Sequence, residues 1–128
     1  MVATAIKSKV KTGVKIIGVG GCGVNILGKL NLTSVKDVEF LAVNTDARSL
    51  MRSKVVNQIQ LSDGGKGTGG NILIGQLAAE QSDELREALK DIDVVVMIAG
   101  MSGGTGGASW VIAKMAKALG AQVFAVAI

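Results

Sequence analysis

Two glycine-rich turns are the segments of this chain best suited to chemistry. Residues 18–23 read GVGGCG and residues 99–107 read AGMSGGTGG, and each follows an apolar run and precedes a helical pattern. A helix N-terminus presents free backbone N–H groups and a partial positive charge, and glycine lets an anion come close to them. One such turn is a weak sign of nucleotide binding, whereas two predict a single phosphate chain held from two sides.

Polar side chains accompany these turns. Thr105 offers a hydroxyl to a phosphate oxygen or to a water on a metal ion, and Asn25 lies one helical turn beyond the first glycines, near a base or a ribose. Residues 44–46 (NTD) follow the second apolar run, where a ribose or a hydrated metal could sit. The glycine-dense loop at residues 64–71 offers further N–H groups that could close over a terminal phosphate. The motif of P-loop proteins is absent.

The alternation of apolar runs with helical patterns predicts an α/β fold. Strands are expected at residues 14–19, 38–43, 55–61, 94–98 and 123–128, and helices at 24–32, 47–54, 71–89 and 109–119. We expect the fourth strand to be buried on both faces, the third to lie nearer an edge, and Gly120 to cap the last helix. The β-α-β order predicts a doubly wound, Rossmann-like parallel sheet in the order 3-2-1-4-5, which brings the glycine turns together at the switch point.

The composition indicates one folded domain and excludes several kinds of site. The chain has 128 residues, 48% of them hydrophobic, with no histidine and one cysteine, Cys22. This excludes Ser-His-Asp and Cys-His nucleophiles, histidine metal sites and an internal disulfide. The lone cysteine, together with the lack of a signal-peptide pattern or of a long apolar stretch, predicts a cytoplasmic protein without direct membrane insertion.

The net charge of +4 comes from the beginning of the chain. We interpret residues 1–12 as a basic, flexible N-terminal arm and residues 13–128 as the folded domain. Four lysines without arginines or aromatic residues among them are a poor match to nucleic acid, so no nucleic-acid partner is expected. These lysines are Lys7, Lys9, Lys11 and Lys15.

Four motifs, taken together, resemble the FtsZ family of tubulin-like GTPases. They are GVGGCGVN at residues 18–25, AVNTDA at 42–47, GKGTGGN at 65–71 and AGMSGGTGG at 99–107, in the order and spacing of that family. The resemblance covers nearly the whole chain from residue 14. It implies the GTP-binding domain of a protein that self-associates into filaments, usually in cell division.

The resemblance also implies GTP or GDP with Mg²⁺ as cofactors. The glycine turn at residues 18–23 would hold the α- and β-phosphates, and the one at residues 99–107 would wrap the phosphates. Residues 44–46 would lie near the nucleotide and its Mg²⁺, and residues 69–71 would sense the γ-phosphate. We expect no catalytic residue and no protein ligand of a metal in this chain. The expected cofactor-binding residues are Gly20, Gly21, Cys22, Gly23, Asn25, Asn44, Thr45, Asp46, Gly69, Gly70, Asn71, Ser102, Gly103, Gly104, Thr105 and Gly106.

The chain departs from the family pattern in places. Ser102 replaces a glycine in a signature turn that is one residue shorter, the pair Ile72-Leu73 replaces a proline and an acid, and Trp110 stands where proline is common. A divergent plasmid or phage relative would also fit these changes. The chain is expected to be incomplete relative to the family and to lack the loop that activates water. We therefore expect weak GTP hydrolysis, or none, from this chain alone.

Two other interpretations stay open at this point. Gly18, Gly20 and Gly23 match GxGxxG, and Asp46 lies about where a ribose-binding acid belongs, as in an NAD- or FAD-linked oxidoreductase. Alternatively, the chain is a structural fragment that exposes apolar surface at its fifth strand.

Overall fold

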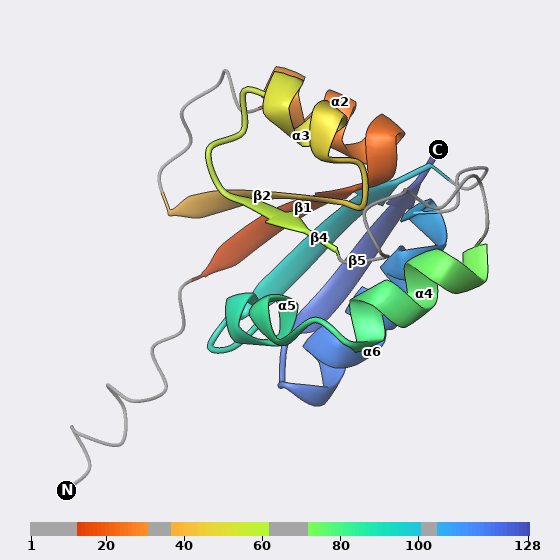
Figure 1. The fold of residues 1–128 in the computed structure, drawn as a ribbon. Helices are drawn as coiled ribbons and strands as arrows, with labels where there is room; N and C mark the ends of the chain where they lie inside the picture. Colours follow the sequence, from red (N-terminus) through yellow and green to blue (C-terminus); the bar gives the residue numbers. More distant parts are fainter. Residues whose placement is uncertain (1–12, 31–36, 62–71, 101–104) are drawn as a thin grey trace, which may run out of the picture.

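One parallel sheet between two layers of helices organises the chain (Figure 1). The computed structural model describes residues 13–30, 37–61, 72–100 and 105–128, without the side chains of Ile72 and Ile74. The order β3-β2-β1-β4-β5 and the parallel pairing confirm the predicted topology. The strands are β1 (Val14–Val19), β2 (Val38–Asn44), β3 (Gln58–Gln60), β4 (Val94–Ala99) and β5 (Gln122–Ala127).

The helices divide between the two faces of the sheet, as right-handed crossovers require. Helices α2 (Gly20–Leu30) and α3 (Ala47–Arg52) cover one face, drawn above the sheet in Figure 1. The opposite face carries α4 (Ile72–Glu80), α5 (Asp83–Ala88) and α6 (Ala108–Ala118), the last preceded by the short 3-10 helix η1 (Thr105–Gly107). Gly120 follows α6 with φ of 98°, which confirms the predicted left-handed cap.

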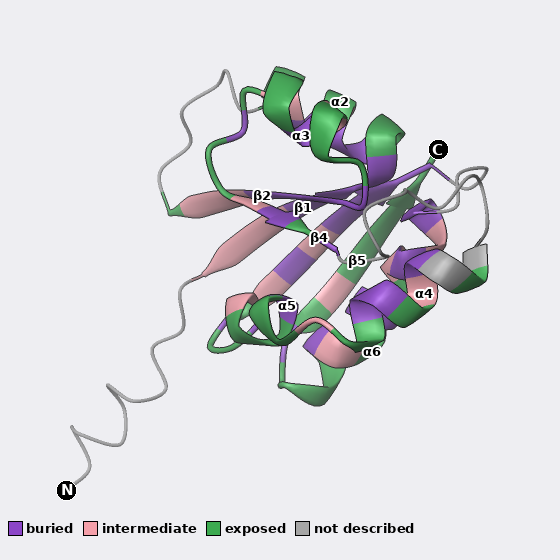
Figure 2. Ribbon diagram, in the orientation of Figure 1, coloured by how far each residue is buried: buried purple, intermediate pink, exposed green. Residues whose placement is uncertain are grey.

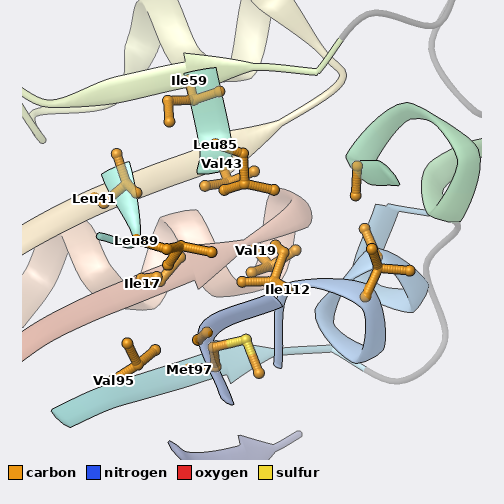
Figure 3. Packing of buried hydrophobic residues seen from close by; sticks show 14 of the residues in the cluster. Ile17, Val19, Leu41, Val43, Ile59, Leu85, Leu89, Val95, Met97 and Ile112 are labelled. Atoms are coloured by element: carbon orange, nitrogen blue, oxygen red, sulfur yellow. The ribbon is translucent and has the colours of Figure 1, made fainter. Parts of the chain in front are cut away.

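The larger core lies between the sheet and α4, α5 and α6 (Figure 3). Alternate residues of each strand point to this face, so the central strands contribute side chains at every second position. Leu85 and Leu89, in and just after α5, and Ile112 of α6 complete it, all three with no exposed area. The strand residues labelled in Figure 3 are Ile17, Val19, Leu41, Val43, Ile59, Val95 and Met97.

A smaller core lies under α2 and α3, and glycines bring α2 close to the sheet. Val24 and Leu27 of α2 pack there with Ala42 of β2. A Cβ on Gly18 of β1 would lie 2.5 Å from the carbonyl oxygen of Gly23, and a Cβ on Gly23 would overlap the carbonyl oxygen of Ile98. The α2 backbone therefore rests directly on the backbones of β1 and β4.

The single helix expected over residues 71–89 is wrong, because Ser82 divides it. The chain forms α4 and α5, and the Ser82 Oγ accepts a hydrogen bond of 3.1 Å from the Leu85 N–H. Ser82 has extended dihedrals, and its hydroxyl serves as the N-cap of α5 instead of continuing α4. The break lets Leu85 and Leu89 turn into the larger core.

Two strand expectations also need correction. The third strand is limited to Gln58–Gln60, because the Gln58 side-chain amide donates to the carbonyls of Leu50 and Val55 and holds the preceding residues in a turn. Its position at the edge of the sheet is as predicted. The fourth strand is not fully buried on both faces: Val94 and Val96 are half-buried, since α2 reaches only the end of β4 near Ile98.

Strand β5 is exposed over most of its length, and Figure 2 draws it largely in green. Phe124 pairs in register with Val96 and is 54% exposed, and Val126 pairs with Ile98 and is 47% exposed. Within the part of the chain that the structure describes, no helix covers this strip. The expectation of uncovered apolar surface at the fifth strand is confirmed.

Gly23→Ala and Gly28→Ala should have opposite effects on stability, although both glycines lie in α2. The new methyl at position 23 would overlap the Ile98 carbonyl, which we expect to cost about 1–3 kcal/mol. At position 28 a Cβ would meet nothing within 4 Å, so alanine should stabilise the helix by about 0.5–1 kcal/mol. Urea unfolding of the three proteins measures both; a Gly23→Ala variant as stable as Gly28→Ala would contradict the close packing of α2.

Candidate nucleotide-binding site

The carboxyl ends of β1, β2 and β4 meet at one edge of the sheet. Val19 pairs with Val43 on one side and with Ala99 on the other, so the turns after these strands begin in one row. Helix α2 begins at Gly20 directly after β1, the turn after β2 follows Asn44, and the glycine turn after β4 begins with Gly100. The topology therefore brings together the motifs that follow β1, β2 and β4, at the place where open parallel sheets bind ligands.

The two glycine turns contact each other. Gly20 has φ of 76°, and a Cβ on it would lie 3.2 Å from the backbone nitrogen of Gly106. A Cβ on Gly100 would lie 2.9 Å from that of Cys22, and one on Gly106 would overlap the Gly100 carbonyl. A side chain on Gly20 or Gly100 would push the start of α2 away from the turn after β4, so the absence of a Cβ lets these backbones lie in contact.

A hydrogen bond between two buried hydroxyls joins the turn after β2 to η1. The Oγ1 atoms of Thr45 and Thr105 are 2.7 Å apart, and the residues are 2% and 7% exposed. They lie on either side of the β1 end, 60 positions apart in the sequence. Both residues are among the expected site residues, but residue type and spacing did not predict that they would bond to each other.

Asn44 and Asp46 shape the turn after β2. The buried Asn44 side chain accepts hydrogen bonds from the N–H groups of Thr45 (2.8 Å) and Asp46 (3.2 Å). Asp46 is the N-cap of α3 and accepts from the N–H groups of Arg48 (2.9 Å) and Ser49 (3.4 Å). The oxygens of both side chains are therefore engaged in the local fold of the turn.

The Asp46 carboxyl titrates below the usual range of an aspartate. The backbone hydrogen bond from Arg48 is the main cause that lowers its pKa, and the hydrogen bonds of Ser49 act in the same direction against partial desolvation. The charge is stabilised because it lies at the start of a helix, where N–H groups and the helix dipole favour an anion.

The glycines of the first turn differ in their surroundings. Gly23 is buried and packs on β4, whereas Gly21 is exposed and a Cβ on it would meet no atom within 4 Å. Cys22 is an exposed free thiol next to it. Gly21 and Cys22 therefore lie at the open start of α2, while Gly23 sets the depth at which α2 packs. The N–H of Gly20 and those of the next residues belong to the first turn of the helix, which has no earlier partners within it.

A groove of about 450 Å³ between α2 and α3 contains positive charge that the sequence analysis did not identify. It brings two expected site residues, Gly21 and Asn25, onto one surface with cationic side chains and two serines. No sequence spacing relates α2 to α3 in this way, because their contact is decided by packing. The other lining residues are Val24, Gly28, Lys29, Ser49, Arg52, Ser53 and Lys54.

Six of the expected site residues lie outside the described residues: Gly69, Gly70, Asn71, Ser102, Gly103 and Gly104. The basic arm expected at residues 1–12 also lies outside them. Among residues 13–30, 37–61, 72–100 and 105–128, no three His, Cys, Asp or Glu side chains gather as a metal site would require. None of the helices described is long and apolar enough to span a bilayer.

The chain matches the family model described as "Tubulin/FtsZ family, GTPase domain" over residues 13–128. The chain belongs to the Tubulin/FtsZ family. The predicted family and its doubly wound fold are thereby confirmed, and the match favours a GTPase-domain site over the dinucleotide alternative.

Members of the Tubulin/FtsZ family resemble the chain closely in sequence and in structure. The cell division protein FtsZ of Mycoplasmopsis pulmonis (strain UAB CTIP) is 44% identical in an alignment of 117 positions that covers 88% of this chain and 30% of that protein. A mutant FtsZ structure from M. jannaschii superposes with a TM-score of 0.87 at 34% identity, covering 98% of this chain and 39% of the other. An empty FtsZ dimer from M. jannaschii superposes with a TM-score of 0.85 at 34% identity, covering 98% of this chain and 38% of the other. The chain thus spans 30–39% of the length of these relatives.

The stabilising effect of the Asp46 cap should disappear in acid. The folded-state pKa lies below the usual value of about 3.8, so the ionised cap stabilises the fold above that value and loses this effect as the pH falls through the folded-state pKa. Thermal unfolding of wild type, Asp46→Asn and Asp46→Ala between neutral pH and pH values below 3.8 measures this.

Asp46→Ala should lower the melting temperature most at neutral pH. The difference in melting temperature between this variant and wild type should become smaller in acid. Asp46→Asn is the control, because asparagine also caps helices but does not titrate. A gap between wild type and Asp46→Ala that widens as the pH falls would refute the assignment of Asp46 as an ionised cap.

Proposed function

We propose that this chain is a GTP- and GDP-binding domain of an FtsZ-like protein. The observation that carries the proposal is the contact between the first and second glycine turns at the carboxyl edge of the sheet, with Gly20 against Gly106. Two helix-initiating turns in contact at one edge of the sheet suit a chain of phosphates better than a single anion. The family match supports guanine nucleotides as the ligand.

The described residues fit a polyphosphate. Open space at Gly21 lets an oxyanion approach the first N–H groups of α2, and Thr105 lies beside the neighbouring Gly20, where a Cβ would be 3.6 Å from the Thr105 Cβ. Asn25 and the cations Lys29 and Arg52 continue this surface along α2 and α3. In this proposal the turns hold the phosphates, and Asn25 is placed for the base or the sugar.

Mg²⁺ would be held through the phosphates of the nucleotide. Asp46 follows β2 at this edge of the sheet, and it already accepts hydrogen bonds from Arg48 and Ser49. It is therefore poorly placed to activate a water, which agrees with our expectation that the chain alone hydrolyses GTP weakly or not at all. Bound Mg²⁺ would neutralise charge on the phosphates.

Filament assembly, a role in cell division and a cytoplasmic location are proposals for the protein that contains this domain. They rest on the family and on the M. jannaschii FtsZ dimer that the chain resembles in structure. Self-association would fit a domain that leaves apolar strand surface open at Phe124 and Val126.

Gly21→Val should weaken nucleotide binding at least tenfold and leave the fold intact. The valine side chain would extend into the open space at the start of α2, where it meets no protein atom but would displace a phosphate. We expect an affinity loss of tenfold or more, equivalent to about 1.4 kcal/mol. Titration of a fluorescent GTP analogue, displaced separately by GTP, GDP, ATP and NAD, measures it.

Ala118→Val is the control, because Ala118 is exposed near the end of α6 and lies outside both the glycine turns and the groove between α2 and α3. It should keep the affinity of the wild-type chain within about twofold. Displacement by GTP and GDP but not by ATP or NAD supports the proposal. Displacement by NAD, or equal binding by the Gly21→Val chain, would overturn it.

A further inference from the structure

In the hydrogen bond between Thr45 and Thr105, a bound ligand would decide which hydroxyl donates and which accepts. Each hydroxyl has one proton and can accept as well as donate, so a bonded pair uses one proton and leaves the other for a third group. At 2.7 Å the two oxygens are at an ordinary O–H···O distance, and either can be the donor. Which hydroxyl keeps the free proton decides whether the pair can donate to a phosphate.

The surroundings favour Thr105 as the hydroxyl that faces a ligand. Thr105 belongs to η1, and a Cβ on Gly20 would lie 3.6 Å from the Thr105 Cβ, so Thr105 lies at the junction of the two glycine turns. Thr45 is 2% exposed and lies behind it, in the turn after β2. A phosphate bound at this junction would therefore accept from Thr105, which in turn would accept from Thr45.

Hydrogen bonds hold the Thr45 backbone where its hydroxyl can donate to Thr105. The Asn44 Oδ1 accepts from the N–H groups of Thr45 and Asp46, and Asp46 caps α3 directly afterwards. Preorganised donors are effective for anions because little reorganisation is needed when the charge arrives.

We propose that Thr45 is a positioning residue, which does not touch the nucleotide but orients the Thr105 hydroxyl as a donor toward a phosphate. This inference rests on the proposed function, since it requires that a phosphate of GTP or GDP binds at Thr105. It differs from the expectation that Thr45 itself contacts the cofactor. The predicted effect of Thr45 on nucleotide affinity is therefore transmitted entirely through Thr105.

The test compares GDP affinity of the full chain with that of Thr45→Val and Thr45→Ser. Valine keeps the shape of threonine and removes the hydroxyl, so we expect GDP to bind about fivefold more weakly. Serine keeps the hydroxyl and should restore the affinity to within about twofold of wild type. Val95→Ala, which opens the core away from the turns, controls for loss of stability alone and should leave the affinity within the same limit.

A double-mutant cycle tests transmission through Thr105. If Thr45 acts only through Thr105, then Thr45→Val should have no further effect on GDP affinity in the Thr105→Val background. Competition against a fluorescent GDP analogue keeps weak binding measurable.

The outcomes separate this inference from the proposed function. If wild type does not bind GDP, the proposed function fails, and the inference fails with it. If wild type binds, then equal affinity of the Thr45→Val chain, an equal loss in Thr45→Ser, or additive losses in the cycle would overturn the positioning role and leave the proposed function standing.

Discussion

The contact of the α2 backbone with the backbones of β1 and β4 is the constraint on which the rest of the structure depends. Gly18 and Gly23 have no Cβ, and any side chain there would overlap a carbonyl oxygen or push the helix away. Because α2 lies so close, its first turn stays at the carboxyl edge of the sheet and touches η1 at Gly106. The same contact closes the smaller core around Leu27. The glycines of the first motif therefore serve packing as well as ligand access.

The polar groups at the sheet edge depend on this placement. The Thr45 and Thr105 hydroxyls bond to each other, and the Asn44 side chain bonds to the backbone of its own turn. Such bonds satisfy buried polar groups that would otherwise be costly. They also hold the turns in position before any ligand arrives, while the N–H groups at the start of α2 stay open beside Gly21.

The two faces of the sheet are covered unequally. The face toward α4, α5 and α6 is packed with fully buried side chains such as Leu85 and Met97, whereas the other face is covered over β1 and β2 but open over β5. Phe124 and Val126 leave apolar area in contact with water, which removes part of the stabilisation that their burial would provide. Relatives of this family are about three times as long as the chain, and the share that the chain spans is 30–39%.

The sequence alone determined the parallel sheet, its strand order and the meeting of the glycine turns, because apolar periodicity and crossover handedness act locally and leave few topologies. It also indicated the Gly120 cap. Tertiary structure alone decided that Ser82 divides a helix, that Gly23 packs on Ile98 and that Thr45 bonds to Thr105. Each of these depends on which atoms far apart in the chain come within a few ångströms, and residue type and spacing do not specify such distances.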